Sequence, residues 1–186
     1  PGQGKYTDDI LRRHPEITGQ KLEYVPDDQG GMQVVVTTVE HSYNPIHPLA
    51  GRELVDTFFG EFERRFPGES GRGLNFFFSD ELEFNISGNL WCDDFAEEFR
   101  RRKGYDIGPH LEEIFTDTGE NPYKTRLDYY DVIVQLEAER YFGPLFDWHE
   151  SHGMIYGCDH GGRGCILTEF GDYFRTVCFN QGPGCD

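Results

Sequence analysis

The sequence is short of positive charge. Its 186 residues carry 17 Lys and Arg against 34 Asp and Glu, which gives a formal net charge of −17. Nucleic acids and anionic membranes both bind basic protein surfaces. We therefore expect neither a nucleic acid nor a membrane as a partner. Neutral or cationic ligands and divalent metal ions remain compatible with this charge.

Long apolar runs and several familiar motifs are also absent. The sequence has no run of about 18 apolar residues, so it contains no transmembrane-helix signal. The segment Gly161-Gly162-Arg163-Gly164 lacks the spacing of a dinucleotide-binding loop, and no phosphate-binding loop with its lysine is present. No Ser or Cys lies in the strand-to-helix elbow of acyl-transfer hydrolases. These absences argue against nucleotide binding and acyl transfer.

Cysteine is sparse. The five residues are Cys92, Cys158, Cys165, Cys178 and Cys185, and none forms a CxxC pair. A structural zinc site is therefore not expected. The four that follow residue 157 would permit a disulfide in an oxidising compartment, whereas free thiols would suit a reducing one. The compartment stays open, with a secreted or periplasmic location favoured.

Aromatic residues, in contrast, are abundant. The chain has 16 Phe and 10 Tyr, and it is long enough to bury one sizeable core. Aromatic rings fill protein cores, and they also stack on sugar rings. Composition alone does not choose between these two uses.

The pattern of apolar and turn residues predicts an α/β fold. Residues 1–30 are polar and rich in Gly, Pro and Asp, so we expect an irregular lead-in with a short helix around 7–13. Residues 31–186 are expected to form one domain of alternating strands and helices. The expected strands are 32–39, 74–79 and 153–158, and the expected helices follow Pro48, span 93–103 and 126–151 with a kink at Pro144, and start again at Thr168.

This alternation predicts parallel β/α units with helices covering a parallel sheet. A complete (β/α)8 TIM-type barrel needs about 250 residues. We therefore expect 31–186 to be part of such a barrel and to belong to a larger polypeptide. The basic run Arg100-Arg101-Arg102-Lys103 before Gly104 is typical of a helix C-terminus.

Polar residues follow each of the three predicted strands. The carboxyl ends of parallel strands meet at one edge of a sheet, where active sites of α/β proteins are built. The three loops are therefore expected to converge. Their polar residues are Glu40, His41, Tyr43 and Asn44 in the first, Asp80, Glu81 and Glu83 in the second, and Asp159, His160 and Arg163 in the third.

Five stretches resemble one enzyme family, in the same order along 32–186. They are Tyr43-Asn44-Pro45 before a Phe-rich helix, Phe76-Phe77-Phe78-Ser79-Asp80-Glu81, Trp91 to Ile107 with its basic run and Gly104-Tyr105-Asp106, Arg126-Leu127-Asp128-Tyr129-Tyr130, and Gly171-Asp172 with Asn180 to Asp186. Together they resemble the α-L-rhamnosidase-like glycoside hydrolases. The resemblance implies a (β/α)8-type catalytic domain, a pair of catalytic carboxylates and a calcium ion near the site.

The resemblance also implies roles for individual acids. Glu81 matches the general acid, and Asp80 beside it would be a metal ligand or a like charge that raises the pKa of Glu81. The second carboxylate is expected after the third strand, where Glu169 is preferred and Asp159 is the alternative. Glu169 would otherwise be a first-turn acid of a helix starting at Thr168.

Five further residues are candidate substrate contacts. His41, Asn44 and His160 would contact sugar hydroxyls, and Arg163 would contact a carboxylated sugar or offset the acidic site. Trp91 would stack on a sugar ring or else fix the next helix to the core.

These residues predict a glycosidase acting on an oligosaccharide or glycoside, with inversion preferred. One alternative is a metal-dependent hydrolase in which Asp80, Glu81, Asp159 and His160 hold a divalent ion, with calcium, magnesium or manganese preferred over zinc. The other is a carbohydrate-binding module without catalytic activity.

Overall fold

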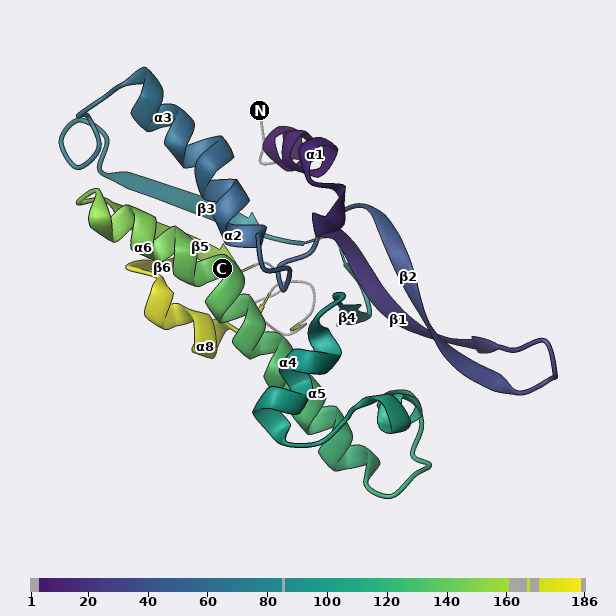
Figure 1. Cartoon of the computed structure of the whole chain (residues 1–186). Helices are drawn as coiled ribbons and strands as arrows, with labels where there is room; N and C mark the ends of the chain where they lie inside the picture. Colours follow the sequence, from purple (N-terminus) through teal and green to yellow (C-terminus); the bar gives the residue numbers. More distant parts are fainter. Residues whose placement is uncertain (1–3, 85, 161–166, 168–170, 185–186) are drawn as a thin grey trace.

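The computed structural model describes residues 4–84, 86–160, 167 and 171–184, apart from the side chains of Lys5, Glu81 and His160. Within these ranges the chain forms two three-stranded sheets and a set of helices that pack between and beside them (Figure 1). In the part of the chain that is described, no helix is long and apolar enough to cross a bilayer.

The first sheet is antiparallel. It contains β1 (Thr18–Pro26), β2 (Met32–Tyr43) and β4 (Asn89–Trp91) in the order β2-β1-β4. The β1–β2 hairpin projects from the body of the molecule (Figure 1). At its tip, Asp27 Oδ1 accepts hydrogen bonds from the backbone N–H groups of Gln29 at 2.8 Å and Gly31 at 2.7 Å.

This sheet corrects two expectations. The short helix expected around 7–13 forms as α1 (Gly4–Arg13), but the chain after it is not irregular, because it continues into a 3-10 turn (Pro15–Ile17) and β1. The strand expected at 32–39 does form, but it pairs antiparallel with β1 and does not enter the parallel sheet. The Asp- and Gly-rich stretch after Pro26 is a hairpin turn, and it lets β2 fold back along β1.

The second sheet is parallel, as expected. It consists of β3 (Phe76–Leu82), β5 (Ile155–His160) and β6 (Gly182–Gly184) in the order β3-β5-β6. The strands expected at 74–79 and 153–158 are thus confirmed and lie side by side. The described residues form a mixed α/β fold, and its three parallel strands do not make a barrel.

The helices expected after Pro48 and over 93–103 and 126–151 form close to these positions, whereas the helix start expected at Thr168 lies outside the described residues. Between β2 and β3 lie α2 (Ala50–Leu54), a π-helical turn (Val55–Phe59) and α3 (Gly60–Arg65). Then follow α4 (Phe95–Lys103), a 3-10 helix (Gly108–Ile114), α5 (Pro122–Glu137), a second π-helical turn (Ala138–Phe142) and α6 (Gly143–Ser151). The last helical pieces are α8 (Tyr173–Thr176) and a 3-10 turn (Val177–Phe179).

The long helix expected at 126–151 changes winding just before Pro144. A proline removes one N–H donor and clashes with the carbonyl of the preceding turn. The π-helical turn at 138–142 directly precedes Gly143 and Pro144. The irregularity therefore occupies the turn on the N-terminal side of the proline.

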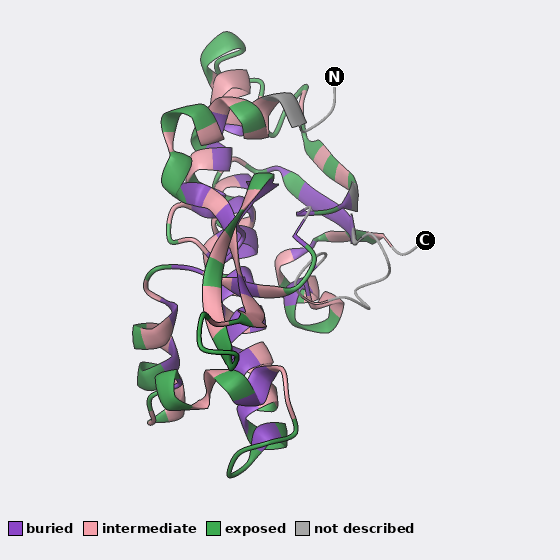
Figure 2. Ribbon diagram, turned by 90° about the vertical axis from the view of Figure 1, so that its right-hand side faces the viewer, coloured by how far each residue is buried: buried purple, intermediate pink, exposed green. Residues whose placement is uncertain are grey.

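Two apolar cores lie on either side of this turn. The first core contains α2, β3, β5 and α6 residues such as Leu54, Phe59, Leu82 and Leu145. The second core joins the antiparallel sheet to α4 and α5 and includes Phe95, Phe99 and Ile133. Figure 2 shows these buried segments running through the middle of the molecule, with exposed residues at its ends.

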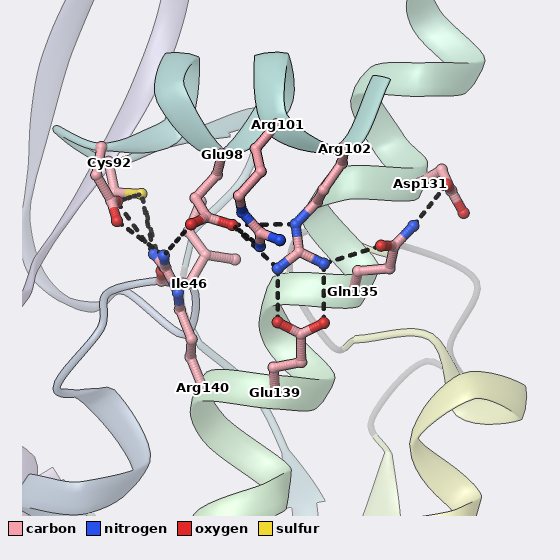
Figure 3. A network of polar contacts seen from close by, with 10 residues as sticks. Ile46, Cys92, Glu98, Arg101, Arg102, Asp131, Gln135, Glu139 and Arg140 are labelled. Atoms are coloured by element: carbon pink, nitrogen blue, oxygen red, sulfur yellow. Dashed lines mark hydrogen bonds and ion pairs between the residues drawn. The ribbon is translucent and has the colours of Figure 1, made fainter. Parts of the chain in front are cut away.

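The basic run at the end of α4 is a helix terminus, as expected. Gly104 ends the helix in a left-handed conformation with φ of 80°. Arg102 donates to both carboxylate oxygens of Glu139 on the adjacent π-helical turn, at 2.8 and 2.5 Å (Figure 3). The run thus binds α4 to the α5 side of the second core.

Candidate functional site

The carboxyl ends of β3 and β5 place two aspartates on neighbouring parallel strands. Ser79 of β3 pairs with Cys158 of β5, and Asp80 and Asp159 follow these two residues. Adjacent strands lie about 4.8 Å apart. Asp80 is exposed, whereas the Asp159 side chain belongs to a residue that is only 7% exposed.

Asp159 belongs to the sheet face opposite the helices, whereas Asp80 also borders the helix side of β3. On the helix side, the Phe77 ring packs against Phe59 with ring centroids 5.0 Å apart. Phe76 and Phe78 alternate with Phe77, and their rings stack on each other 6.0 Å apart on the other face. A Cβ on Gly184 would lie 2.8 Å from Phe78 Cζ and 3.1 Å from Asp159 Cβ. The Phe78 ring therefore lies close to Asp159.

Asp159 is electrostatically unusual. Its Oδ1 atom is buried, and no group within the described residues donates a hydrogen bond to it. Burying a carboxylate oxygen without a donor costs free energy, so such atoms are rare outside functional sites. An oxygen in this state keeps an unused capacity to accept a hydrogen bond.

The backbone beneath Asp159 is fixed by Asn180. Its Nδ2 donates to the carbonyl of Cys158 at 2.7 Å, and its Oδ1 accepts from the Cys158 N–H at 3.1 Å. The Gln181 side chain accepts from the Tyr156 N–H at 3.1 Å. The side-chain amides of Asn180 and Gln181 thus hydrogen-bond the backbone of β5 in addition to the pairing between β5 and β6, and they position the end of β5. In the sequence, Asn180 stands out only as part of the family resemblance, and its hydrogen bonds to the Cys158 backbone were not predicted.

An apolar cavity of about 260 Å³ lies next to Asp80, between β3 and the helices α1, α2 and α6. Of the described residues that line it, Asp80 alone carries a carboxylate. The lining residues are Tyr6, Leu54, Phe58, Phe59, Phe77, Phe78, Ser79, Asp80, Leu145 and Tyr156.

The remaining expected contacts lie in different surroundings. His41 is exposed at a bulge of β2 and has a positive φ of 59°, which is uncommon for a residue with a side chain. Asn44 is buried, and its Nδ2 donates to the Trp91 carbonyl at 2.8 Å. This bond gives Asn44 a structural role between the end of β2 and β4. A sugar contact at either residue stays a prediction.

Trp91 is half-buried in β4. Its ring lies 4.8 Å from the ring of Phe95, the first residue of α4. Of the two uses expected for Trp91, this contact supports attachment of the next helix to the core.

Four expected site residues are outside the described parts. The side chains of Glu81 and His160 are not described, and Arg163 and Glu169 lie outside the described ranges. Their roles therefore stay predictions. Among the residues that are described, no three His, Cys, Asp or Glu side chains come together as a metal-binding group. The described residues thus do not by themselves form the expected calcium site around Asp80.

Among the solved structures, a rhamnosidase resembles this chain in fold. No protein-family model matches the sequence, and no curated protein matches it. The solved structure of a rhamnosidase from Novosphingobium sp. PP1Y superimposes on this chain with a TM-score of 0.57 and 18% sequence identity. The match covers 86% of this chain and 14% of the rhamnosidase chain. This chain therefore shares its fold with a short stretch of a much longer rhamnosidase.

Proposed function

We propose that this chain is part of a glycoside hydrolase that cleaves a glycosidic bond with a pair of carboxylates. One observation carries the proposal: Asp159 is buried with an unpartnered Oδ1 at the end of β5, beside the Asp80-Glu81 end of β3. The similarity in fold to a rhamnosidase supports the same reading. Two acids on adjacent strand ends suit this reaction, because it needs one acid and one base around the bond that is cleaved.

In the proposed mechanism, Glu81 protonates the departing oxygen. The second carboxylate removes a proton from a water molecule that attacks the opposite face of the sugar, which inverts the anomeric centre. The burial of Asp159 favours it for this second role, and Glu169 remains the alternative. Asp80 would then shape the charge around Glu81.

The test is turnover by the longest polypeptide that carries this chain. A panel of nitrophenyl glycosides identifies the sugar, and the variants Glu81→Gln, Asp159→Asn and Glu169→Gln identify the acids. We expect Glu81→Gln to lower kcat at least 100-fold on poor leaving groups. Glu83→Gln is the matched control, because Glu83 is an exposed acid two residues further along. The anomer formed first, observed by NMR, distinguishes inversion from retention.

Other outcomes would replace the proposal. Turnover that a chelator abolishes and that returns with a divalent ion would support the metal-dependent hydrolase. Sugar binding without any turnover, in wild type and variants alike, would support a carbohydrate-binding module. Full activity in all three carboxyl variants would exclude the carboxylate-pair mechanism at these positions.

We also propose that further β/α units of the same polypeptide cover the open face of the parallel sheet. Phe76, Phe78 and Ile155 are 49%, 42% and 46% exposed on this face. Apolar sheet faces of this kind are normally covered, and the fold match spans only 14% of the longer rhamnosidase chain.

Thiol labelling of Phe76→Cys tests this second proposal. The introduced thiol should react freely in the 186-residue chain and slowly in a longer polypeptide, and peptide mass spectrometry separates it from the exposed Cys178. Equal reaction in both proteins would show that the face stays open.

A further inference from the structure

Glu137, the last residue of α5, is the most deeply buried acid among the described residues. It has 0% of its surface exposed, and neither carboxylate oxygen accepts or donates a hydrogen bond. An ionised carboxylate in this position would be strongly unfavourable. Nothing in the proposed hydrolytic mechanism uses this residue.

The segment 172–184 lies against this part of the long helix. Arg175 on α8 forms an ion pair with Asp131 on α5, and a Cβ on Gly143 would lie 3.8 Å from the ring of Phe179. Thr176 between them is fully buried. These contacts place α8 and its 3-10 turn over the junction where Glu137 lies.

The charges around Glu137 favour its neutral form. Burial raises the pKa of Glu137 well above its ordinary value, and the carboxylate of Asp172, which caps α8, raises it further. Tyr129 on the same helix is itself kept neutral, because burial raises its pKa. The neighbouring Arg140 and Arg175 are engaged with Asp94 and Asp131, respectively. Glu137 therefore lacks a cation that would stabilise its ionised form among the described residues.

We propose that Glu137 is a proton-dependent latch that holds the segment 172–184 against α5. When protonated, the side chain stays buried and the segment stays closed. When ionised, the carboxylate gains solvation only if the segment moves away from α5. The segment is suited to this motion, because it consists of one α-helical turn, one 3-10 turn and a three-residue strand.

Opening would reach the candidate site. The same segment carries Asn180, which fixes the backbone of Cys158, and Gly184, which pairs with Asp159. The surroundings of Asp159 would therefore loosen as the segment opens. This consequence depends on the proposed function, whereas the latch itself does not.

The direction of the pH effect follows from the number of protons that Glu137 binds in the closed and open states. In the open state Glu137 titrates near the ordinary value of 4.5, and in the closed state its pKa is higher. Closing therefore takes up a proton, and it weakens as the pH rises above about 4.5. The opening equilibrium should increase by up to about tenfold per pH unit until the closed-state pKa is passed.

Hydrogen exchange of the 186-residue chain between pH 5 and pH 8 tests the latch. After correction for intrinsic exchange, protection of the amides in 173–184 should fall with rising pH, while protection in α4 stays constant. Glu137→Gln should remove this pH dependence. At pH 8 its protection in 173–184 should exceed that of wild type by the factor by which wild-type protection falls between pH 5 and pH 8. Glu150→Gln, which changes an exposed acid on α6, should behave as wild type.

Three results would overturn the proposal. The first is constant protection of 173–184 in wild type across this pH range. The second is an unchanged pH dependence in Glu137→Gln. The third is a pH dependence shared equally by α4, because that would report unfolding of the whole domain. The wild-type comparison of 173–184 with α4 decides the question even if a variant does not fold.

Discussion

Asn180 and the backbone of Cys158 form a closed pair of hydrogen bonds. The Asn180 amide donates to the carbonyl of Cys158 and accepts from its N–H, at 2.7 and 3.1 Å. Cys158 is fully buried in β5, one residue before Asp159. The Asn180 side chain thus adds two hydrogen bonds where β5 pairs with β6, and it holds the residue next to the candidate catalytic acid.

Replacing Asn180 should therefore destabilise the parallel sheet. Asn180→Ala leaves a buried N–H and a buried carbonyl without partners, and we expect a loss of about 1–3 kcal/mol in the free energy of unfolding. Urea denaturation measures this loss. Asn75→Ala, at an exposed asparagine before β3, is the control and should change stability by less than about 0.5 kcal/mol. Equal effects of the two variants would contradict the role of Asn180.

Glycines in β5 and β6 should differ in how well they tolerate replacement by alanine. A Cβ on Gly157 would lie 2.6 Å from Phe78 Cδ2 and 2.8 Å from the carbonyl oxygen of Gly182. Gly157→Ala should therefore cost about 1–3 kcal/mol through overpacking. At Gly182 the nearest atom to an added Cβ is 3.5 Å away, so Gly182→Ala should be nearly neutral. Thermal unfolding of both variants checks the contrast, and a Gly157→Ala protein as stable as wild type would contradict the packing of Phe78 over β5.

Arg140 should be a stability residue of the second core. Its guanidinium donates to both oxygens of Asp94 at 3.0 and 2.7 Å and to the Ile46 carbonyl at 2.7 Å (Figure 3). Arg140→Met should cost about 1.5–3 kcal/mol, because it removes charged hydrogen bonds at a mostly buried side chain. Arg100→Met, at an exposed position of α4, should have little effect. A double-mutant cycle with Asp94→Asn measures the coupling, and additive effects would show that the pair contributes little.

The Arg140–Asp94 pair should also make the free energy of unfolding depend on pH in acid. Burial alone would raise the pKa of Asp94, but hydrogen bonds from Arg140 and Cys92 lower it below the ordinary 3.8. The stabilisation is therefore present above about pH 3.8 and is lost as the pH falls through the lower folded-state value. Wild type should lose stability more steeply than Arg140→Met below pH 4. Parallel pH profiles of the two proteins would contradict this prediction.

Asp159 should lower the free energy of unfolding and should also be required for turnover. Its buried, unpartnered Oδ1 destabilises the folded state, so Asp159→Asn should unfold at the same or a higher urea concentration. The same variant should lose turnover under the proposed mechanism. A variant that is both inactive and markedly less stable would instead indicate a structural role for this carboxylate.

The sequence predicted elements better than it predicted their pairing. The stripe that includes Leu54 and Phe59 and the acid-to-base gradient of α4 are local signals, and both helices formed where these signals placed them. The β-branched run 32–39 also formed a strand. Its partner β1 was not predicted. Gln20, Lys21, Glu23 and Tyr24 give that strand a polar composition, and the Gly- and Asp-rich turn after it has the composition of irregular chain.

The candidate site was predictable only in part. The positions of Asp80 and Asp159 near the ends of β3 and β5 were predictable, because an apolar run that ends in an acid is visible in one sequence. Glu137 and Asn180 gave no such signal. An acid on a helix is usually solvated, and its burial depends on which distant segment packs over it. Likewise, the bond from Asn180 to Cys158 joins residues that are far apart along the chain, and their spacing carries no pattern.

The π-helical turn at 138–142 determines which core each half of the long helix serves. Before it, Tyr129, Ile133 and Leu136 pack into the second core, whereas Phe142 at its end and Leu145 after it pack into the first. A π-helical turn takes up one more residue than an α-helical turn. If the same five residues were wound as a regular α-helix, α6 would rotate relative to α5 by about 100°, and Leu145 would no longer face the first core. The wide turn therefore sets the direction of α6.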